Sequence, residues 1–180
     1  MNDFALTHPQ LNLIISQIIS AVATVLLLCS VQFKKHRTIV MIQALAAVLF
    51  AIQYFMIGAY EGMICNLVGS VRNAVYSLRN KNKYVDSAFC PAVFSLIFLI
   101  SGILTYKNPV SLLPTFAMII SSFVLWIPQT QKLRALTYPT SLMWLVYNII
   151  NRSYVAILTE ILNEISLTVG LIRYRSKKKT

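Results

Sequence analysis

Apolar residues occur along this chain in runs of about 20, the length that an α-helix needs to cross a membrane. Polar residues gather in the short segments between these runs. The pattern predicts seven membrane-spanning helices in the 180 residues, joined by short loops. The predicted spans are residues 10–32, 38–57, 60–79, 86–106, 109–128, 135–151 and 153–173. The expected fold class is therefore an all-α membrane protein with seven transmembrane helices.

The composition agrees with this interpretation and excludes several other classes. Hydrophobic residues make up 57% of the chain and charged residues 12%, whereas soluble domains have about 45–50% and about 25%. Disordered basic tails are poor in apolar residues, and a nucleic-acid binder would not contain such unbroken apolar runs. We therefore expect a lipid bilayer as the surroundings and no nucleic acid as a partner. The short polar segment before the first span lacks the features of a cleaved signal peptide, and none is expected.

The net charge of +11 arises from basic residues that gather on one side of the predicted membrane. Lys107 and Arg152 fall on the opposite side, and Arg72 lies inside a span. The remaining 13 of the 16 are Lys34, Lys35, Arg37, Arg79, Lys81, Lys83, Lys132, Arg134, Arg173, Arg175, Lys177, Lys178 and Lys179. Because short cytoplasmic loops collect Lys and Arg, the N-terminus is expected outside and the C-terminus in the cytoplasm. The basic C-terminal tail is also expected to touch anionic lipid heads.

The chain contains an internal repeat, with an offset of 94 residues in most of the unit and 97 upstream. Matched loop charges and polar positions carry this assignment, since apolar residues alone would match in any pair of membrane helices. The matched pairs are Phe50/Trp144, Tyr60/Tyr154, Asn66/Glu160 and Arg79/Arg173 at the first offset, and Thr24/Ser121, Gln32/Gln129, Lys35/Lys132 and Arg37/Arg134 at the second.

The repeat unit is three spans long, and the fourth span is left over. Because three is odd, the fourth span must return the chain across the membrane, so that both units have the same orientation. This predicts a 3+1+3 arrangement of two parallel triple-helix bundles. The first bundle covers residues 1–82, the linker helix residues 83–107, and the second bundle with its basic tail residues 108–180.

Short motifs resemble a known transporter superfamily. Trp126-Ile-Pro-Gln129 at the end of the fifth span, followed by Lys132, Ser141 and Trp144, resembles the PQ-loop pattern of the SWEET/PQ-loop (MtN3-like) superfamily. Three further segments, at residues 54–60, 66–73 and 172–175, more closely resemble YgjV-type bacterial inner-membrane proteins. The resemblance covers nearly the whole chain and implies a 3+1+3 fold in a bacterial inner membrane. Nicotinamide-riboside carriers of the PnuC type share this plan and are a neighbouring possibility.

Polar residues within the spans indicate where a ligand would bind, because polar groups inside a membrane are costly. In the third span Asn66, Ser70 and Asn73 recur on one helical face. Comparable faces in the other spans are expected to converge on one central cavity. The candidate substrate-binding residues are Phe50, Asn66, Asn73, Trp144, Asn148, Glu160 and Asn163.

The SWEET resemblance implies roles for four of these residues. In SWEET-type carriers an aromatic residue of each unit's second helix stacks on the substrate, and an Asn of the third helix hydrogen-bonds it. The matching positions are Phe50 and Trp144, then Asn66 and Glu160. Glu160 departs from the pattern, since a carboxylate can accept hydrogen bonds from hydroxyls, bind a cation or carry a proton. The expected substrate is a small polar or cationic metabolite, sugar-like or nucleoside-like.

Three other residues suggest a conformational role. Arg72 and Glu164 lie at similar depth, and an unpaired charge there costs at least about 2.5–3.5 kcal/mol, so they are predicted to form an ion pair or gate. Pro128 is a candidate hinge, because a proline inside a helix removes a hydrogen bond. Pro114 and Pro139 accompany it in the second unit, whereas the aligned positions of the first unit hold no proline. Rocking of the two units, which such prolines are thought to permit, is therefore either asymmetric or lost.

Two interpretations of the intramembrane polar residues stay open. Such residues often only join helices, at about 0.6 kcal/mol each. That interpretation is favoured for Ser20, Thr24, Gln43 and Ser70, whereas Asn66 fits either role. The chain is accordingly expected to be a small-molecule carrier or, alternatively, a non-transporting scaffold or regulatory protein. No enzyme, cofactor or metal site is expected, since no catalytic or metal-ligand constellation falls in a span. The oligomeric state is open.

Overall fold

Each predicted span corresponds to one α-helix in the computed structural model, which describes residues 9–30, 33, 36–79, 81–127 and 130–175. The helices are α2 (Pro9–Ser30), α3 (His36–Met56), α4 (Tyr60–Tyr76), α5 (Phe89–Leu104), α6 (Leu112–Trp126), α7 (Thr130–Ile150) and α8 (Tyr154–Arg175), with the 3-10 turn η1 (Pro109–Ser111) before α6. The largest difference is at α7, which begins ahead of the predicted residue 135. Hydropathy marks the lipid-buried part of a helix, and the polar first turn of α7 lies outside that part.

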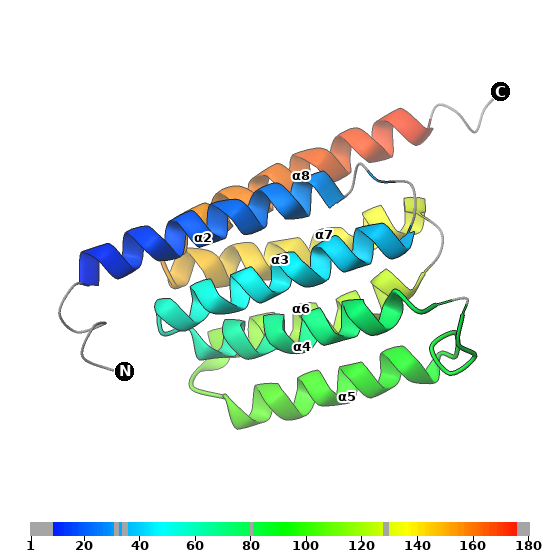
Figure 1. Cartoon of the computed structure of the whole chain (residues 1–180), viewed down its shortest axis with the longest axis horizontal. Coiled ribbons are helices and arrows are strands. Elements are labelled where there is room, and N and C mark those ends of the chain that lie inside the picture. The colour runs from blue at the N-terminus through cyan, green and yellow to red at the C-terminus, as the bar shows by residue number, and fades with distance from the viewer. Residues whose placement is uncertain (1–8, 31–32, 34–35, 80, 128–129, 176–180) are drawn as a thin grey trace.

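The helices lie side by side along the long axis of the molecule and alternate in direction (Figure 1). Each helix packs on the next one in the chain, and two further contacts, α2 with α8 and α4 with α6, join the halves. Helix α5 lies at the edge, against α4 and α6. If α2 to α4 and α6 to α8 are equivalent units, the two joining contacts are equivalent as well, because each brings the first helix of one unit onto the third helix of the other.

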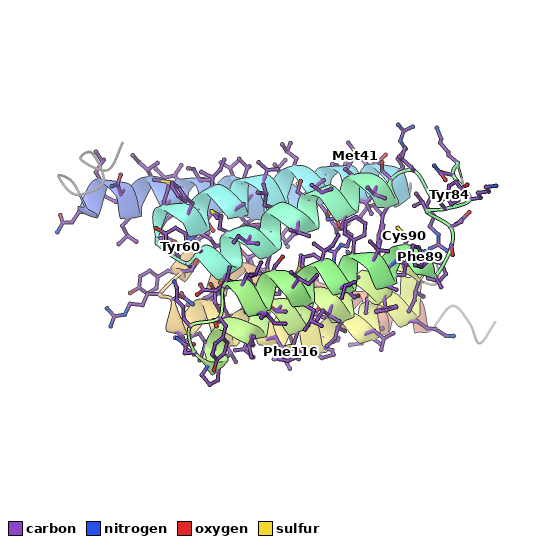
Figure 2. The ribbon with its side chains drawn as sticks, turned by 90° about the horizontal axis from the view of Figure 1, so that it is seen from below. Met41, Tyr60, Tyr84, Phe89, Cys90 and Phe116 are labelled. Carbon is purple, nitrogen blue, oxygen red and sulfur yellow. The ribbon has the colours of Figure 1, made fainter. Side chains whose placement is uncertain are left out.

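The distribution of polar and apolar side chains is the reverse of that in a soluble protein. Large apolar residues are exposed on all seven α-helices of the described chain. Met41 and Phe116, for example, project outward on opposite sides of the bundle (Figure 2). Gln53, Arg72 and Asn148 are instead buried in the interior. An apolar outer surface around a polar interior is what a hydrocarbon environment requires.

Three segments of the described chain are long and apolar enough to cross a membrane, namely Gln10–Ser30, Arg37–Met56 and Pro109–Trp126. The apolar helix Phe89–Leu104 is shorter. The all-α class is therefore confirmed, while the number of membrane crossings stays a prediction.

The turn between α3 and α4 is built again, 94 residues later, between α7 and α8. Both helix ends and both helix starts are shifted by that number. The backbone hydrogen bonds correspond one to one: Ala59 to Tyr54 and Ser153 to Asn148, Gly58 to Phe55 and Arg152 to Ile149, Ile57 to Gln53 and Asn151 to Tyr147, and Met63 to Ala59 and Ile157 to Ser153. The offset predicted from side-chain patterns is thus reproduced in backbone geometry.

One position of this repeated turn is left-handed, and the two copies fill it differently. Gly58 has φ of 74° and its counterpart Arg152 has φ of 54°. A left-handed conformation costs a residue with a Cβ atom about 1–2 kcal/mol, whereas glycine adopts it freely. The second copy of the turn therefore carries strain that the first avoids.

We predict that Arg152→Gly stabilises the protein by about 0.5–1 kcal/mol, because relief of this strain outweighs the greater entropy of glycine in the unfolded chain. Reversible unfolding in mild detergent measures the change. Arg152→Ala is the matched control, since it removes the side chain but keeps the Cβ atom, and it should give no gain. A glycine variant less stable than the alanine variant would show that the turn is unstrained.

Candidate ligand-binding cavity

A cavity of about 230 Å³ lies between the two halves of the bundle, lined by α2, α3, α4, α6, α7 and α8. All seven residues predicted to bind substrate line it: Phe50, Asn66, Asn73, Trp144, Asn148, Glu160 and Asn163. The predicted convergence of polar faces therefore agrees with the structure. Ligand binding by these residues stays a prediction.

The cavity lining is itself repeated. Seven pairs of lining residues are separated by 94: Gln43/Thr137, Ala46/Thr140, Phe50/Trp144, Tyr54/Asn148, Asn66/Glu160, Gly69/Asn163 and Asn73/Leu167. Equivalent positions can face one shared space only if the axis that relates the two halves runs through that space. The cavity is thus a property of the repeat and not of one helix pair.

Aromatic side chains form one end of the cavity. The rings of Tyr54 and Trp144 are stacked with centroids 5.9 Å apart and planes inclined by 27°. Tyr147 meets Trp144 edge to face, with centroids 5.8 Å apart. Phe50 packs against the same cluster. Both predicted stacking residues therefore lie beside a buried pair of tyrosines.

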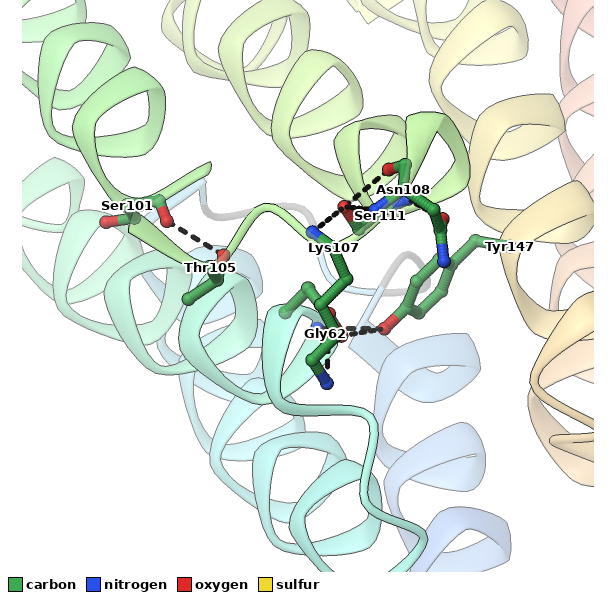
Figure 3. Close-up of polar contacts among 8 residues, drawn as sticks. Gly62, Ser101, Thr105, Lys107, Asn108, Ser111 and Tyr147 are labelled. Carbon is green, nitrogen blue, oxygen red and sulfur yellow. Dashed lines mark hydrogen bonds and ion pairs between the residues drawn. The ribbon is translucent and has the colours of Figure 1, made fainter. Parts of the chain in front are cut away.

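Hydrogen bonds between the halves close this end, and we call the residues that make them the Tyr54 seal (Gln53, Tyr54, Tyr147, Asn148 and Ser153). The Tyr54 hydroxyl donates to Asn148 Oδ1 at 2.6 Å. Gln53 Nε2 donates to Ser153 Oγ at 2.9 Å. The Tyr147 hydroxyl accepts a bond of 3.1 Å from the Gly62 amide (Figure 3). All five seal residues are buried, so the seal excludes water from this end.

A partly exposed ion pair lies beside the seal. Lys107 Nζ is 3.2 Å from Glu61 Oε1, and the Tyr147 hydroxyl is 3.4 Å from Glu61 Oε2. Lys107 is held in the turn before η1, where Asn108 accepts from the Ser111 amide at 3.1 Å and Ser111 Oγ accepts from the Lys107 amide at 3.1 Å (Figure 3). The pair attaches the α5–α6 connection to the start of α4.

Glu160 and Asn66, which occupy equivalent positions, present their polar groups to the cavity. Glu160 Oε2 accepts a hydrogen bond of 2.5 Å from Ser141 Oγ on α7. Asn66 Nδ2 donates to the Gly62 carbonyl of its own helix at 2.9 Å. The amide is satisfied within its own helix, whereas the carboxyl group of Glu160 reaches the neighbouring helix α7.

Arg72 corrects one sequence prediction. Within the described residues the ion pairs are Arg79–Asp86 and Lys107–Glu61, and the expected pair of Arg72 with Glu164 is not formed. Equal depth along the helices predicted that pair, but depth does not specify which way a side chain turns about its axis. Arg72 turns toward α6, while Glu164 lies on α8 with Oε1 buried and without a hydrogen-bond partner in the described chain.

The guanidinium of Arg72 is held by neutral acceptors. Nη1 donates to Ser121 Oγ at 2.7 Å, Ser122 Oγ at 3.2 Å and the Met118 carbonyl at 3.3 Å. Both Nε and Nη2 donate to Asn73 Oδ1 at 3.2 Å. The arginine is 3% exposed and lines the cavity. It therefore brings an uncompensated positive charge to the cavity wall.

The opposite end of the bundle has its own contacts. Arg79 forms an ion pair of 3.1 Å with Asp86, donates to the Trp126 carbonyl and lies 4.6 Å from the centre of the Trp126 ring. Trp126 Nε1 donates to the Val85 carbonyl at 3.3 Å. The predicted hinge Pro128 and the basic run at Lys177–Lys179 lie outside the described residues.

Of the four residues predicted to join helices, two do so in the structure, one has an unpaired hydroxyl in the described chain and one lines the cavity. The hydroxyls of Thr24 and Thr159 are 2.5 Å apart and join α2 to α8, and Ser70 Oγ donates to the Ala44 carbonyl of α3 at 2.9 Å. These two predictions are confirmed. The Ser20 hydroxyl has no hydrogen-bond partner within the described residues, and Gln43 lines the cavity.

The sequence pattern did not mark Tyr147, the Gln53–Ser153 bond or the Glu61–Lys107 pair, and Tyr54 was not among the predicted substrate-binding residues. One signal for Tyr54 and Asn148 was present, since these residues are separated by the repeat offset of 94 and both can hydrogen-bond. Nothing comparable distinguished Glu61 and Lys107, which belong to different parts of the proposed plan.

The helical bundle, its apolar surface and its polar interior define the class as an integral helical membrane protein. Residues 14–178 match the family Imp-YgjV, described as bacterial inner membrane protein, and the chain belongs to that family. This confirms the YgjV resemblance and the inner-membrane location. The chain has no match among curated proteins and none among solved structures.

The seal provides a test of coupling between the halves. Tyr54→Phe leaves Asn148 Oδ1 without its donor, and we expect a loss of about 1 kcal/mol in the free energy of unfolding, within the range of hydrogen bonds between membrane helices. Asn148→Ala should remove little more from the Tyr54→Phe background. Unfolding in mild detergent measures the double-mutant cycle. Tyr84→Phe, at an exposed tyrosine, is the control. Strictly additive losses would show that the hydroxyl and amide are not coupled.

Proposed function

We propose that this protein is a small-molecule carrier of the bacterial inner membrane that works by alternating access. In this proposal two triple-helix bundles, residues 1–82 and 108–180, rock about the shared cavity, and the helix in residues 83–107 joins them. The observation that carries the proposal is the cavity between two repeated halves, closed at one end by the Tyr54 seal. A bond between equivalent positions can break when the halves separate without disrupting either half.

The proposed arrangement is 3+1+3 with seven transmembrane helices. Its support is the turn repeated at an offset of 94, the two equivalent contacts between the halves and the position of α5 at the edge. It is also consistent with the SWEET/PQ-loop resemblance of the chain. In this plan Phe50 and Trp144 stack on the ligand, while Asn66 and Glu160 hydrogen-bond it.

The proposed topology has the N-terminus outside and the C-terminus in the cytoplasm. Its support is the alternation of helix direction, which brings Arg37, Arg79 and Lys132 to one end of the bundle and Lys107 and Arg152 to the other. Basic residues on short loops are retained on the cytoplasmic side. The Tyr54 seal then closes the outer end, and the cavity lies toward the cytoplasm.

This topology predicts the activity of fused reporters. Green fluorescent protein joined to the C-terminus should fluoresce, and alkaline phosphatase joined there should be inactive, because the phosphatase needs the oxidising periplasm. The control is a phosphatase fusion that truncates the chain after Lys107, which should be active. A C-terminal phosphatase fusion as active as the control would reverse the proposed orientation.

A non-transporting scaffold is the second candidate function. Two observations favour it. The first half has no proline inside α3 or α4, and polar contacts hold the halves together at both ends, Tyr54 with Asn148 and Arg79 with the Trp126 carbonyl. Such a protein would keep the bundle in one state, with no exchange of the cavity between the two sides of the membrane.

Accessibility of the cavity from each side distinguishes the two candidates. With the three native cysteines replaced by alanine, Asn66→Cys places one thiol at the cavity wall. For a carrier we expect a membrane-impermeant thiol reagent to label it in both spheroplasts and inverted vesicles. Leu67→Cys is the matched control, because Leu67 is adjacent but lies on the exposed apolar surface, and it should react from neither side. Labelling of Asn66→Cys from one side only would favour the scaffold.

A further inference from the structure

We propose that the ligand of the cavity is a small zwitterion of the α-amino-acid class, whose carboxylate is bound by Arg72 and whose ammonium group is bound by Glu160. This inference rests on the proposed carrier function and specifies its substrate class. It differs from the sugar-like or nucleoside-like ligand expected from the sequence, because neither Arg72 nor Glu160 has an oppositely charged side chain of the described chain within ion-pair distance.

Arg72 is the positive site. Its guanidinium donates hydrogen bonds to one amide oxygen, two hydroxyls and one carbonyl. No carboxylate of the described chain lies within ion-pair distance of it. The rings of Phe98 and Tyr76 lie 5.5 and 6.0 Å away, which favours a cation without neutralising it. A guanidinium has five donors. The bonds made here leave one Nη2 hydrogen to be donated to a ligand.

Glu160 is the negative site. Ser141 is a neutral donor to its carboxylate, and no Lys or Arg of the described chain lies within ion-pair distance. Arg72 itself is therefore more than 4 Å away, so the two charges line one cavity without touching. Glu160 projects from α8 and Arg72 from α4, in opposite halves of the molecule.

Two uncompensated charges in one low-dielectric site select a ligand of complementary charge. Burying an unpaired ion is costly, and pairing with hydrogen bonds offsets that cost. The free Nη2 hydrogen of Arg72 can make one charge-assisted hydrogen bond to a carboxylate oxygen. A neutral sugar would leave both ions unpaired, and a simple cation would leave Arg72 unpaired. A ligand carrying both groups, held between the halves, pairs both ions at once.

The cavity is also small. Its 230 Å³ lies below the roughly 300–1,000 Å³ of pockets for drug-sized molecules. Phe50 and Trp144 add an aromatic surface to the cavity wall. A single amino acid with a modest side chain fits this description better than a nucleoside or disaccharide.

The test uses the purified full-length chain in detergent, with the twenty L-amino acids as probes. Each amino acid that raises the unfolding temperature is compared with its decarboxylated amine and its deaminated acid by calorimetric titration. We expect at least one amino acid to bind, and both of its analogues to bind about tenfold more weakly or worse, the loss expected for one unpaired charged hydrogen bond. This comparison is made on the unaltered protein, so it does not depend on any variant folding.

Charge-specific variants then assign each group. Arg72→Gln should bind the amine as well as the amino acid, and Glu160→Gln should bind the acid as well as the amino acid. A residue with a purely structural role would weaken all three ligands alike. Arg72→Lys keeps the charge and should retain the preference for a carboxylate. The matched control is Lys83→Gln, since it removes one charge from an exposed residue that does not line the cavity, and it should bind as the unaltered protein does.

Three results would overturn the inference: binding of no amino acid, tighter binding of a neutral sugar or nucleoside, or binding of an amino acid that is unchanged by Arg72→Gln. The carrier proposal is judged separately by two-sided labelling of Asn66→Cys. Two-sided labelling without amino-acid binding would reject the zwitterion and leave the carrier, whereas one-sided labelling would reject the carrier itself.

Discussion

The hydrogen bond between Tyr54 and Asn148 joins two positions that are equivalent in the repeat, and the arrangement of the bundle depends on it. Side chains at equivalent positions can meet only next to the axis that relates the two halves. The 2.6 Å bond therefore marks the junction of the two units. The stacked ring of Trp144, the turn that follows each helix and the start of the cavity all lie next to this junction.

A repeated scaffold carries charges that are not repeated. Asn66 and Glu160 are equivalent positions, but one is an amide and the other a carboxylate. Arg72 corresponds to Ser166, so the positive charge also has no counterpart. The turn after α3 is repeated after α7, whereas the basic side chain Arg72 lies in the first half of the cavity wall and the acidic side chain Glu160 in the second. A symmetric cavity would bind a ligand in two orientations with equal affinity, and the unequal charges remove that ambiguity.

The sequence predicted what depends on pattern along the chain, and it failed where rotation about a helix axis decides. Helix positions, the offset of 94 and the convergence of Phe50, Trp144 and Glu160 on one cavity follow from periodicity and matching. The Arg72–Glu164 pair was inferred from depth alone, and in the structure Arg72 turns toward α6. Lys107 meets Glu61 through a turn set by Asn108 and Ser111, local chemistry that no span-level pattern reveals.

The two ends of the bundle are joined by different contacts. At the end near α4's last turn, Arg79 donates to the Trp126 carbonyl of the other half and lies over the Trp126 ring. At the other end the Tyr54 seal makes direct hydrogen bonds among buried groups, which leave costly unsatisfied atoms when they separate. In the proposed carrier, exchange of the cavity between the two sides requires each set of contacts to break in turn. A ligand that binds both Arg72 and Glu160 would draw the halves together below the seal and would supply part of the energy needed to exchange one closure for the other.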